Sequence, residues 1–145
     1  MIEKAINSAF EEDLGDGDHS AIACIPKEKK SKAALFVKDN GILAGVTIAK
    51  QVFDLYGAFN FKQFLNDGDL VNVGDIAFEV EGEARGILAC ERLLLNIMQR
   101  MSGIATETFK YNELINKTNT KLLDTRKTTP NFRVFEKEAV RIGGG

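Results

Sequence analysis

The sequence is poor in the residues on which several kinds of functional site depend. Its 145 residues include no tryptophan, two prolines, two cysteines and one histidine. Cys24 and Cys90 lie in apolar runs, without a second cysteine or a histidine at metal-ligand spacing, so we expect two reduced, structural thiols and no zinc site. No serine or cysteine lies in a Gly-x-Ser-x-Gly context, so nothing here favours a covalent nucleophile.

Long apolar runs are also missing. No stretch approaches the roughly 20 consecutive apolar residues that a membrane helix needs. Glu3 and Lys4 stand where a signal peptide would begin its apolar region. A composition of 44% hydrophobic and 28% charged residues is ordinary for a globular domain, so the chain can build a core. We therefore expect a soluble protein of the cytoplasm that does not associate with membranes.

The charge is small but unevenly distributed. The formal net charge of −2 argues against a general nucleic-acid binder. The segment 121–145, however, holds six cations against three anions, whereas the first 120 residues are acidic. Such a cationic end is typical of a local site for small anions, and it is also found on solvated helix faces. Charge alone leaves both interpretations open.

Periodicity predicts a mixture of helices and short strands. Apolar spacing of three and four residues indicates helices, and short β-branched runs between Gly, Asn and Asp turns indicate strands. Gly103 is expected to break a helical stretch into two helices. The predicted helices span 1–14, 45–56, 84–101, 104–116 and 130–140, and the predicted extended segments span 32–38, 42–44, 59–65, 70–73, 76–80 and 121–124.

These elements predict an α+β fold of two parts. Residues 1–117 are expected to form an N-terminal domain in which helices accompany a small antiparallel sheet, with 32–38 and 42–44 joined as a hairpin. Residues 118–145 are expected to begin an α/β barrel with a strand, a charged loop and a helix. One such unit cannot close a barrel, so we expect the barrel to be incomplete in this chain.

The segment Asp124–Pro130, called here the cationic loop, follows the last predicted strand. It contains Arg126 and Lys127 among three threonines. The arginine fork matches a carboxylate or phosphate, lysine adds a compact charge, and threonine adds a hydroxyl donor. The loop is therefore a candidate oxyanion site. The simpler alternative is a solvated polar turn in which Asp124 pairs with Arg126.

Arg92 is the second candidate. It lies on one helical stripe with Leu88 and Leu95, and Asn96 and Gln99 extend the stripe with polar groups. A cation on an apolar stripe either extends to water, pairs with a buried carboxylate, or meets an anionic group across an interface. The sequence leaves these three roles open.

Two further features call for an explanation. Acidic residues crowd the end of the first predicted helix, where they are electrostatically unfavourable, so something other than helix stability favours them. Gly143–Gly145 could let backbone amides approach a phosphate closely, but no Walker-type lysine accompanies them.

Taken together, four motifs closely resemble the quinolinate phosphoribosyltransferase family, also called nicotinate-nucleotide pyrophosphorylase (carboxylating). The segment 135–145 resembles the same family, so the resemblance covers essentially the whole chain but only the family's first half. The motifs are Glu12–Asp18, Glu91-Arg92 with Leu95-Asn96, Gln99–Thr106 and Asp124–Pro130.

The resemblance implies a glycosyltransferase of the pentosyl class that acts in NAD biosynthesis. Family members transfer phosphoribose from phosphoribosyl pyrophosphate to the ring nitrogen of quinolinate, usually with Mg²⁺, and release pyrophosphate and CO2 to give nicotinate mononucleotide. Thr125, Arg126 and Lys127 resemble the substrate-contacting loop. Arg92 resembles an arginine supplied to the neighbouring subunit's site, which implies a homodimer with shared active sites. No catalytic residue and no metal ligand is assigned.

Further site residues of the family come from its second half. We therefore expect this chain alone to lack turnover. A related phosphoribosyltransferase-like protein with another substrate, such as the homologue associated with molybdate transport, is one alternative. A biotinyl- or lipoyl-like module is another, because Gly68–Asp75 is similar to turns of those domains, although no lysine stands at the expected hairpin tip. A truncated inactive paralogue is a third.

Overall fold

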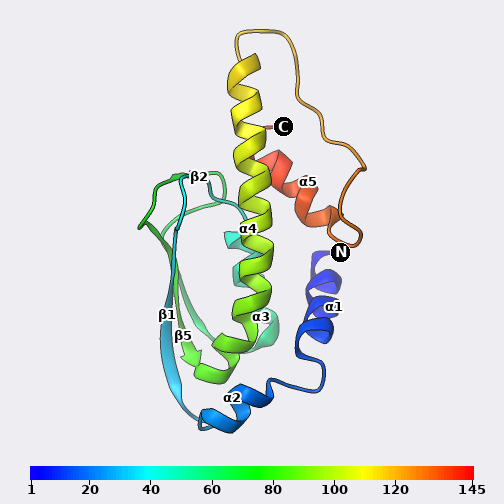
Figure 1. The fold of residues 1–145 in the computed structure, drawn as a ribbon. Coiled ribbons are helices and arrows are strands. Elements are labelled where there is room, and N and C mark those ends of the chain that lie inside the picture. The colour runs from blue at the N-terminus through cyan, green and yellow to red at the C-terminus, as the bar shows by residue number, and fades with distance from the viewer.

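The computed structural model describes residues 1–145 as helices arranged around one long helix, with two small sheets on one side of it (Figure 1). The predicted α+β class is confirmed. The elements in chain order are α1 (Ile2–Leu14), α2 (His19–Cys24), β1 (Lys30–Phe36), β2 (Gly41–Ile42), α3 (Val46–Tyr56), β3 (Asn60–Gln63), β4 (Leu70–Val71), β5 (Ile76–Glu83), α4 (Ala84–Ile115) and α5 (Arg133–Ile142).

The strands form two small antiparallel sheets. One has the order β1-β5-β3, and the other pairs β2 with β4. The predicted hairpin between 32–38 and 42–44 is therefore wrong. The chain leaves the first sheet at Val37, whose N–H donates to the Asp75 carbonyl at 2.8 Å and whose carbonyl accepts from Gly74 at 3.0 Å. Because the later strands take the available pairing edges, the Asp39–Gly41 turn does not bring its two flanks together.

The long helix α4 is a single element of 32 residues, so the prediction of two helices separated at Gly103 is wrong. A glycine in a helix costs only about 1 kcal/mol relative to alanine, and tertiary packing readily outweighs that amount. Met98, Met101 and Ala105 are buried on both sides of the glycine, so the core-facing stripe runs past it without interruption. The core itself lies between α4, α3 and the sheets.

Hydroxyl groups of α4 form hydrogen bonds with β2 and with the segment that directly follows it. The Ser102 hydroxyl accepts from the Ala44 N–H at 3.0 Å and donates to the Ala44 carbonyl at 3.1 Å. The Thr106 hydroxyl, one turn further along, accepts from the Ile42 N–H at 2.9 Å. Ser102 and Thr106 share a helix face because they are four residues apart. A short strand is thereby bound directly to the helix.

Asp67 caps α3 from a distant loop. Its carboxylate accepts backbone N–H groups from Gly45 at 2.6 Å, Val46 at 2.8 Å and Thr47 at 3.1 Å. These donors belong to the first turn of the helix, where no intrahelical acceptor exists, and the helix dipole favours an anion there. Gly45 has φ 100°, which a glycine adopts without steric cost.

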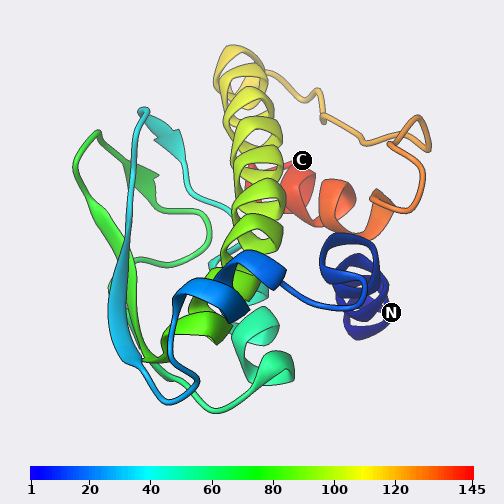
Figure 2. The ribbon, with the colours of Figure 1, turned by 60° about the horizontal axis from the view of Figure 1, so that its bottom comes forward.

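The C-terminal helix α5 packs on α4 (Figures 1 and 2). A Cβ added at Gly143 would lie 2.5 Å from the Ala105 carbonyl oxygen, so this glycine permits close contact with α4. The Asn112 side-chain amide donates to the Gly143 carbonyl at 3.1 Å. Gly143 thus contributes to helix packing in this chain.

The strand predicted at 121–124 is wrong, since this segment is irregular. A strand needs a hydrogen-bonded neighbour, and no other strand pairs with this segment.

Both cysteines are free, but only Cys90 is buried, and burial raises the pKa of its thiol to about 12. Cys24 is exposed, so the expectation of two structural thiols holds for Cys90 alone. None of the helices combines the length and apolar character needed to cross a membrane.

Candidate anion-binding site

The cationic loop is held at both ends by the first turns of α5. Lys137 forms an ion pair with Asp124 at the start of the loop. At its end, the Arg133 Nε donates to the Thr128 hydroxyl at 3.2 Å, and the Thr129 N–H donates to the Glu136 carboxylate at 3.2 Å. The same helix therefore contacts the loop both where it begins and where it ends.

The middle of the loop is open. Thr125, Arg126 and Lys127 are all exposed. The only bond among them is local, because the Lys127 backbone N–H donates to the Thr125 hydroxyl at 3.1 Å. Neither cation forms an ion pair, and Asp124 pairs with Lys137, so the Asp124–Arg126 pair of the simpler alternative does not form. Two adjacent cations thus face solvent from a loop with anchored ends.

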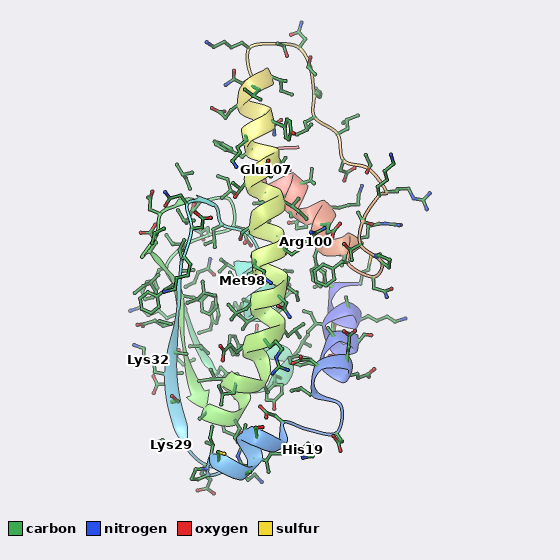
Figure 3. The ribbon with its side chains drawn as sticks, viewed as in Figure 1. His19, Lys29, Lys32, Met98, Arg100 and Glu107 are labelled. Atoms are coloured by element: carbon green, nitrogen blue, oxygen red, sulfur yellow. The ribbon has the colours of Figure 1, made fainter.

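Glu136 is the most buried charged group near the loop, with 6% of the residue exposed. The Arg100 guanidinium of α4 donates to it twice, from Nε at 3.1 Å and from Nη2 at 2.9 Å. Burial opposes ionisation of this carboxyl, but the hydrogen bonds from Thr129 and Arg100 outweigh burial and leave the pKa of Glu136 below its ordinary value. The position of Arg100 on α4 is seen in Figure 3.

Sequence reasoning missed the pair formed by Glu136 and Arg100. The two residues are 36 positions apart, and each has the surroundings of an ordinary charged helix residue in the sequence. The one available signal was position, because Glu136 lies within the first turns of the helix that directly follows the loop.

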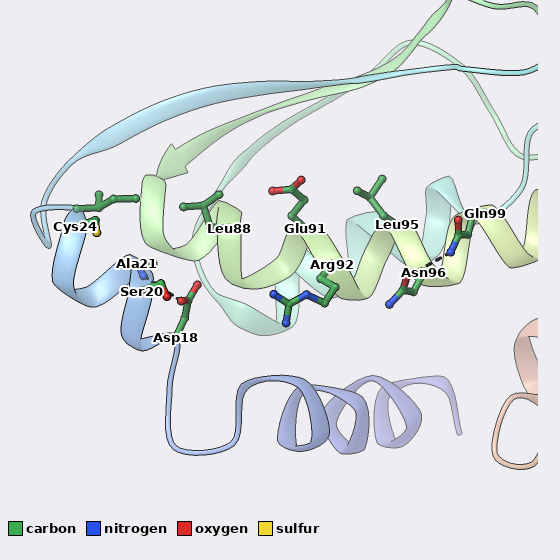
Figure 4. Close-up of a pocket in the computed structure, with 11 residues that line it drawn as sticks. Asp18, Ser20, Ala21, Cys24, Leu88, Glu91, Arg92, Leu95, Asn96 and Gln99 are labelled. Atoms are coloured by element: carbon green, nitrogen blue, oxygen red, sulfur yellow. Dashed lines mark hydrogen bonds between the residues drawn. The ribbon is translucent and has the colours of Figure 1, made fainter.

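Arg92 lies on the outer face of α4, next to a polar groove (Figure 4). Its side chain is 71% exposed, and its Nη1 is 3.0 Å from the carboxylate of Asp13, which is 21% exposed. The pairing with Arg92 gives Asp13, one of the acidic residues crowded at the end of α1, a structural role. Asp18 has another, because it caps α2 by accepting a hydrogen bond from the Ala21 N–H. The groove is lined by Asp18, Ser20, Ala21, Cys24, Ile25, Leu88, Glu91, Arg92, Leu95, Asn96 and Gln99.

Within one chain, the structure does not join the two candidate regions. No residue of the cationic loop lines the groove around Arg92. Arg92 and Arg100 are eight residues apart on the same helix, which separates them by roughly 12 Å along its axis. The structure therefore shows Arg92 and the cationic loop as two separate regions of this chain.

In this chain, an α+β domain with one long helix is followed by the cationic loop and by a helix that packs back on the long helix. The family model for the N-terminal domain of quinolinate phosphoribosyl transferase matches residues 18–102, and the model for the C-terminal domain of that family matches residues 104–145. The chain belongs to the quinolinate phosphoribosyl transferase family. The proposed domain boundary at residue 117 stays a prediction.

Individual relatives agree with this assignment. The chain is 40% identical to the probable nicotinate-nucleotide pyrophosphorylase [carboxylating] of Bacillus subtilis, over 100% of this chain and 50% of the relative. It is 44% identical to the corresponding protein of Archaeoglobus fulgidus, over 86% of this chain and 48% of the relative. The crystal structure of NadC from Streptococcus pyogenes matches with a TM-score of 0.94 and 41% identity, over 99% of this chain and 52% of that chain. The chain thus spans about half the length of these relatives.

Proposed function

We propose that this chain forms part of a carboxylating nicotinate-nucleotide pyrophosphorylase, in which phosphoribose passes from phosphoribosyl pyrophosphate to the ring nitrogen of quinolinate. Pyrophosphate and CO2 leave, and nicotinate mononucleotide is formed. The observation that carries the proposal is the pair of unpaired, exposed cations at Arg126 and Lys127 on a loop with anchored ends. Membership of the family supplies the reaction class, and a cytoplasmic location stays part of the proposal.

The loop suits a dicarboxylate. Quinolinate carries two carboxylates, and the guanidinium of Arg126 can bind one of them in bidentate fashion while Lys127 adds a second charge. The Thr125 hydroxyl accepts the Lys127 N–H and so shapes the turn between the two. Anchored ends reduce the conformational entropy that binding would otherwise cost. The chemistry then depends on positioning and charge stabilisation, which agrees with the absence of a nucleophile motif.

We further propose that Arg92 serves the site of a second copy of the chain. Leu88 and Leu95 flank it and are each 41% exposed, and Phe36 nearby on β1 is 49% exposed. Leu95 lines both the groove around Arg92 and an apolar hollow beside β1 that includes Phe36. A cation surrounded by exposed apolar side chains is typical of the centre of a protein interface. A homodimer would bury this face and deliver Arg92 to the partner's cationic loop.

Mg²⁺ enters this proposal only with the pyrophosphate donor. The chain contains no group of three or more His, Cys, Asp or Glu side chains arranged to hold a metal ion. Mg²⁺ that arrives with substrate phosphates needs only one or two protein carboxylates, so no step is assigned here to a protein-bound ion. In this half of the site, Arg126 and Lys127 offset the negative charge of the quinolinate carboxylates.

Calorimetric titration with quinolinate tests the proposal. We expect the chain to bind quinolinate and Arg126→Ala to weaken binding by roughly 10-fold or more, because a charge-assisted bidentate contact is lost. Lys110→Ala is the matched control, since Lys110 is an exposed cation of α4 that is paired with Glu107. Equal affinities of wild type and Arg126→Ala would contradict the assignment of the loop.

A further inference from the structure

The contact between Glu136 and Thr129 differs from the two other contacts that hold the cationic loop. Lys137–Asp124 and Arg133–Thr128 lie at the surface, where such contacts contribute little. Glu136 is buried, and its two oxygens have separate partners. Oε1 accepts both bonds from Arg100, whereas Oε2 accepts the backbone N–H of Thr129. The carboxylate therefore connects α4 to the backbone of the loop.

In this connection the two helices determine where the loop lies, and the loop does not determine where the carboxylate lies. A buried carboxylate needs a positive partner and hydrogen bonds to stay ionised, and Arg100 supplies the charge together with two of those bonds. Arg100 extends from a long helix that is packed into the core, so the position of the carboxylate is set by α4 and α5. The Thr129 N–H then binds an acceptor whose place the loop does not determine. A third contact, from Arg100 Nη2 to the Thr129 hydroxyl at 3.4 Å, reinforces the same end.

We propose that Glu136 and Arg100 are positioning residues for the cationic loop. Thr129 follows Lys127 by two residues, so fixing its backbone limits where Lys127 and Arg126 can lie. Binding constellations work only when held to within about 0.5 Å, which a solvated turn does not achieve by itself. Both carboxylate oxygens of Glu136 are already engaged, so the residue acts through the loop and not by contact with a ligand. The inference rests on the proposed function in naming quinolinate as that ligand.

Two readouts on the 145-residue chain separate this inference from the function itself. The first is hydrogen exchange of the Thr129 amide, which needs no ligand. The second is quinolinate affinity from calorimetry, with the melting temperature recorded for each variant. Glu136→Gln preserves shape but removes the charge, and Arg100→Lys keeps the charge but loses the two-pronged geometry. Glu138→Gln is the matched control, because Glu138 lies on the same helix and pairs only with Arg141.

We expect Glu136→Gln to lower the protection of the Thr129 amide by about 10-fold, since a charge-assisted bond becomes a neutral one. Quinolinate affinity should fall with it, and Arg100→Lys should have an intermediate effect. Glu138→Gln should leave both readouts unchanged.

Unchanged Thr129 protection in Glu136→Gln would overturn the inference. So would unchanged quinolinate affinity alongside a lower melting temperature, because Glu136 would then be merely structural. If Glu136→Gln does not fold, Arg100→Lys decides by the same two readouts. If the wild-type chain does not bind quinolinate, the proposed function fails, and Thr129 protection alone still decides whether the pair positions the loop.

Discussion

At the scale of single residues, carboxylates do much of the structural work in this chain. Asp67, Glu136 and Asp18 each accept backbone N–H groups that regular structure leaves without an acceptor. Such bonds are charge-assisted and stronger than neutral ones. The acidic composition of the first 120 residues thus has a structural explanation at Asp18 and Asp67.

Replacing Asp67 with alanine should lower the free energy of unfolding by about 2 kcal/mol, because N-cap substitutions reach that value and three N–H groups lose their acceptor. Urea denaturation measures the change. Asp54→Ala provides the comparison, since Asp54 forms only an exposed pair with Lys50, and it should change stability by less than about 0.5 kcal/mol. Similar losses in both variants would contradict the capping role.

Stability should decrease in acid through Glu136. Its folded-state pKa lies below the ordinary value of 4.5, so the folded state binds fewer protons at this group than the unfolded state does. The contribution is fully present above pH 4.5 and is lost as the pH falls through the folded-state pKa. Denaturation curves of wild type and Glu136→Gln should converge in this acidic range. A constant gap between them down to low pH would argue against the linkage.

Residue identity could be predicted better than residue partnership. Arg126, Lys127 and Arg92 were predicted as site residues because their types and neighbours are unusual for their positions, and their role stays a prediction. The pairing of Asp124 with Lys137 and the role of Glu136 were not predicted, because those contacts depend on how α5 folds back on the loop. Spacing within an element is visible in a sequence, whereas the approach of two elements is not.

At the scale of elements, the errors share one physical cause. The hairpin at Asp39–Gly41, the break at Gly103 and the strand at 121–124 were all inferred from local signals. In each case, tertiary pairing or packing decides the outcome: later strands pair with β1 and β2, the core continues past Gly103, and no strand pairs with 121–124. Helices with a clear apolar face, such as α1 and α3, were predicted closely.

Two glycines of the helical region should respond to alanine in opposite directions. A Cβ at Gly103 would meet nothing within 4 Å, so Gly103→Ala should stabilise α4 by about 0.5–1 kcal/mol. At Gly143 a Cβ would lie 2.5 Å from a carbonyl oxygen, so Gly143→Ala should destabilise the packing of α5 on α4. Thermal unfolding of the two variants measures both effects. Loss of stability in Gly103→Ala would show that the glycine has another role.

At the scale of the whole molecule, the chain spans about half of its relatives and holds part of the proposed site. We expect the 145-residue chain alone to form no nicotinate mononucleotide from quinolinate and phosphoribosyl pyrophosphate. A fusion to the second half of the Bacillus subtilis relative should restore turnover, and Arg92→Ala in that fusion should weaken quinolinate affinity. Chromatographic detection of the product is the assay. Turnover by the chain alone would show that the second half is dispensable.

The hydroxyl contacts of Ser102 with Ala44 and of Thr106 with Ile42 have a consequence for the spacing of residues along α4. They fix the register of α4 against this segment, so the places of Arg92 and Arg100 depend on the number of residues between each of them and Ser102. Insertion of one residue between Arg92 and Arg100 would rotate one side chain relative to the other by about 100° and shift it by about 1.5 Å along the helix. The segment 93–99 should therefore tolerate substitution of its exposed side chains far better than any change in its length.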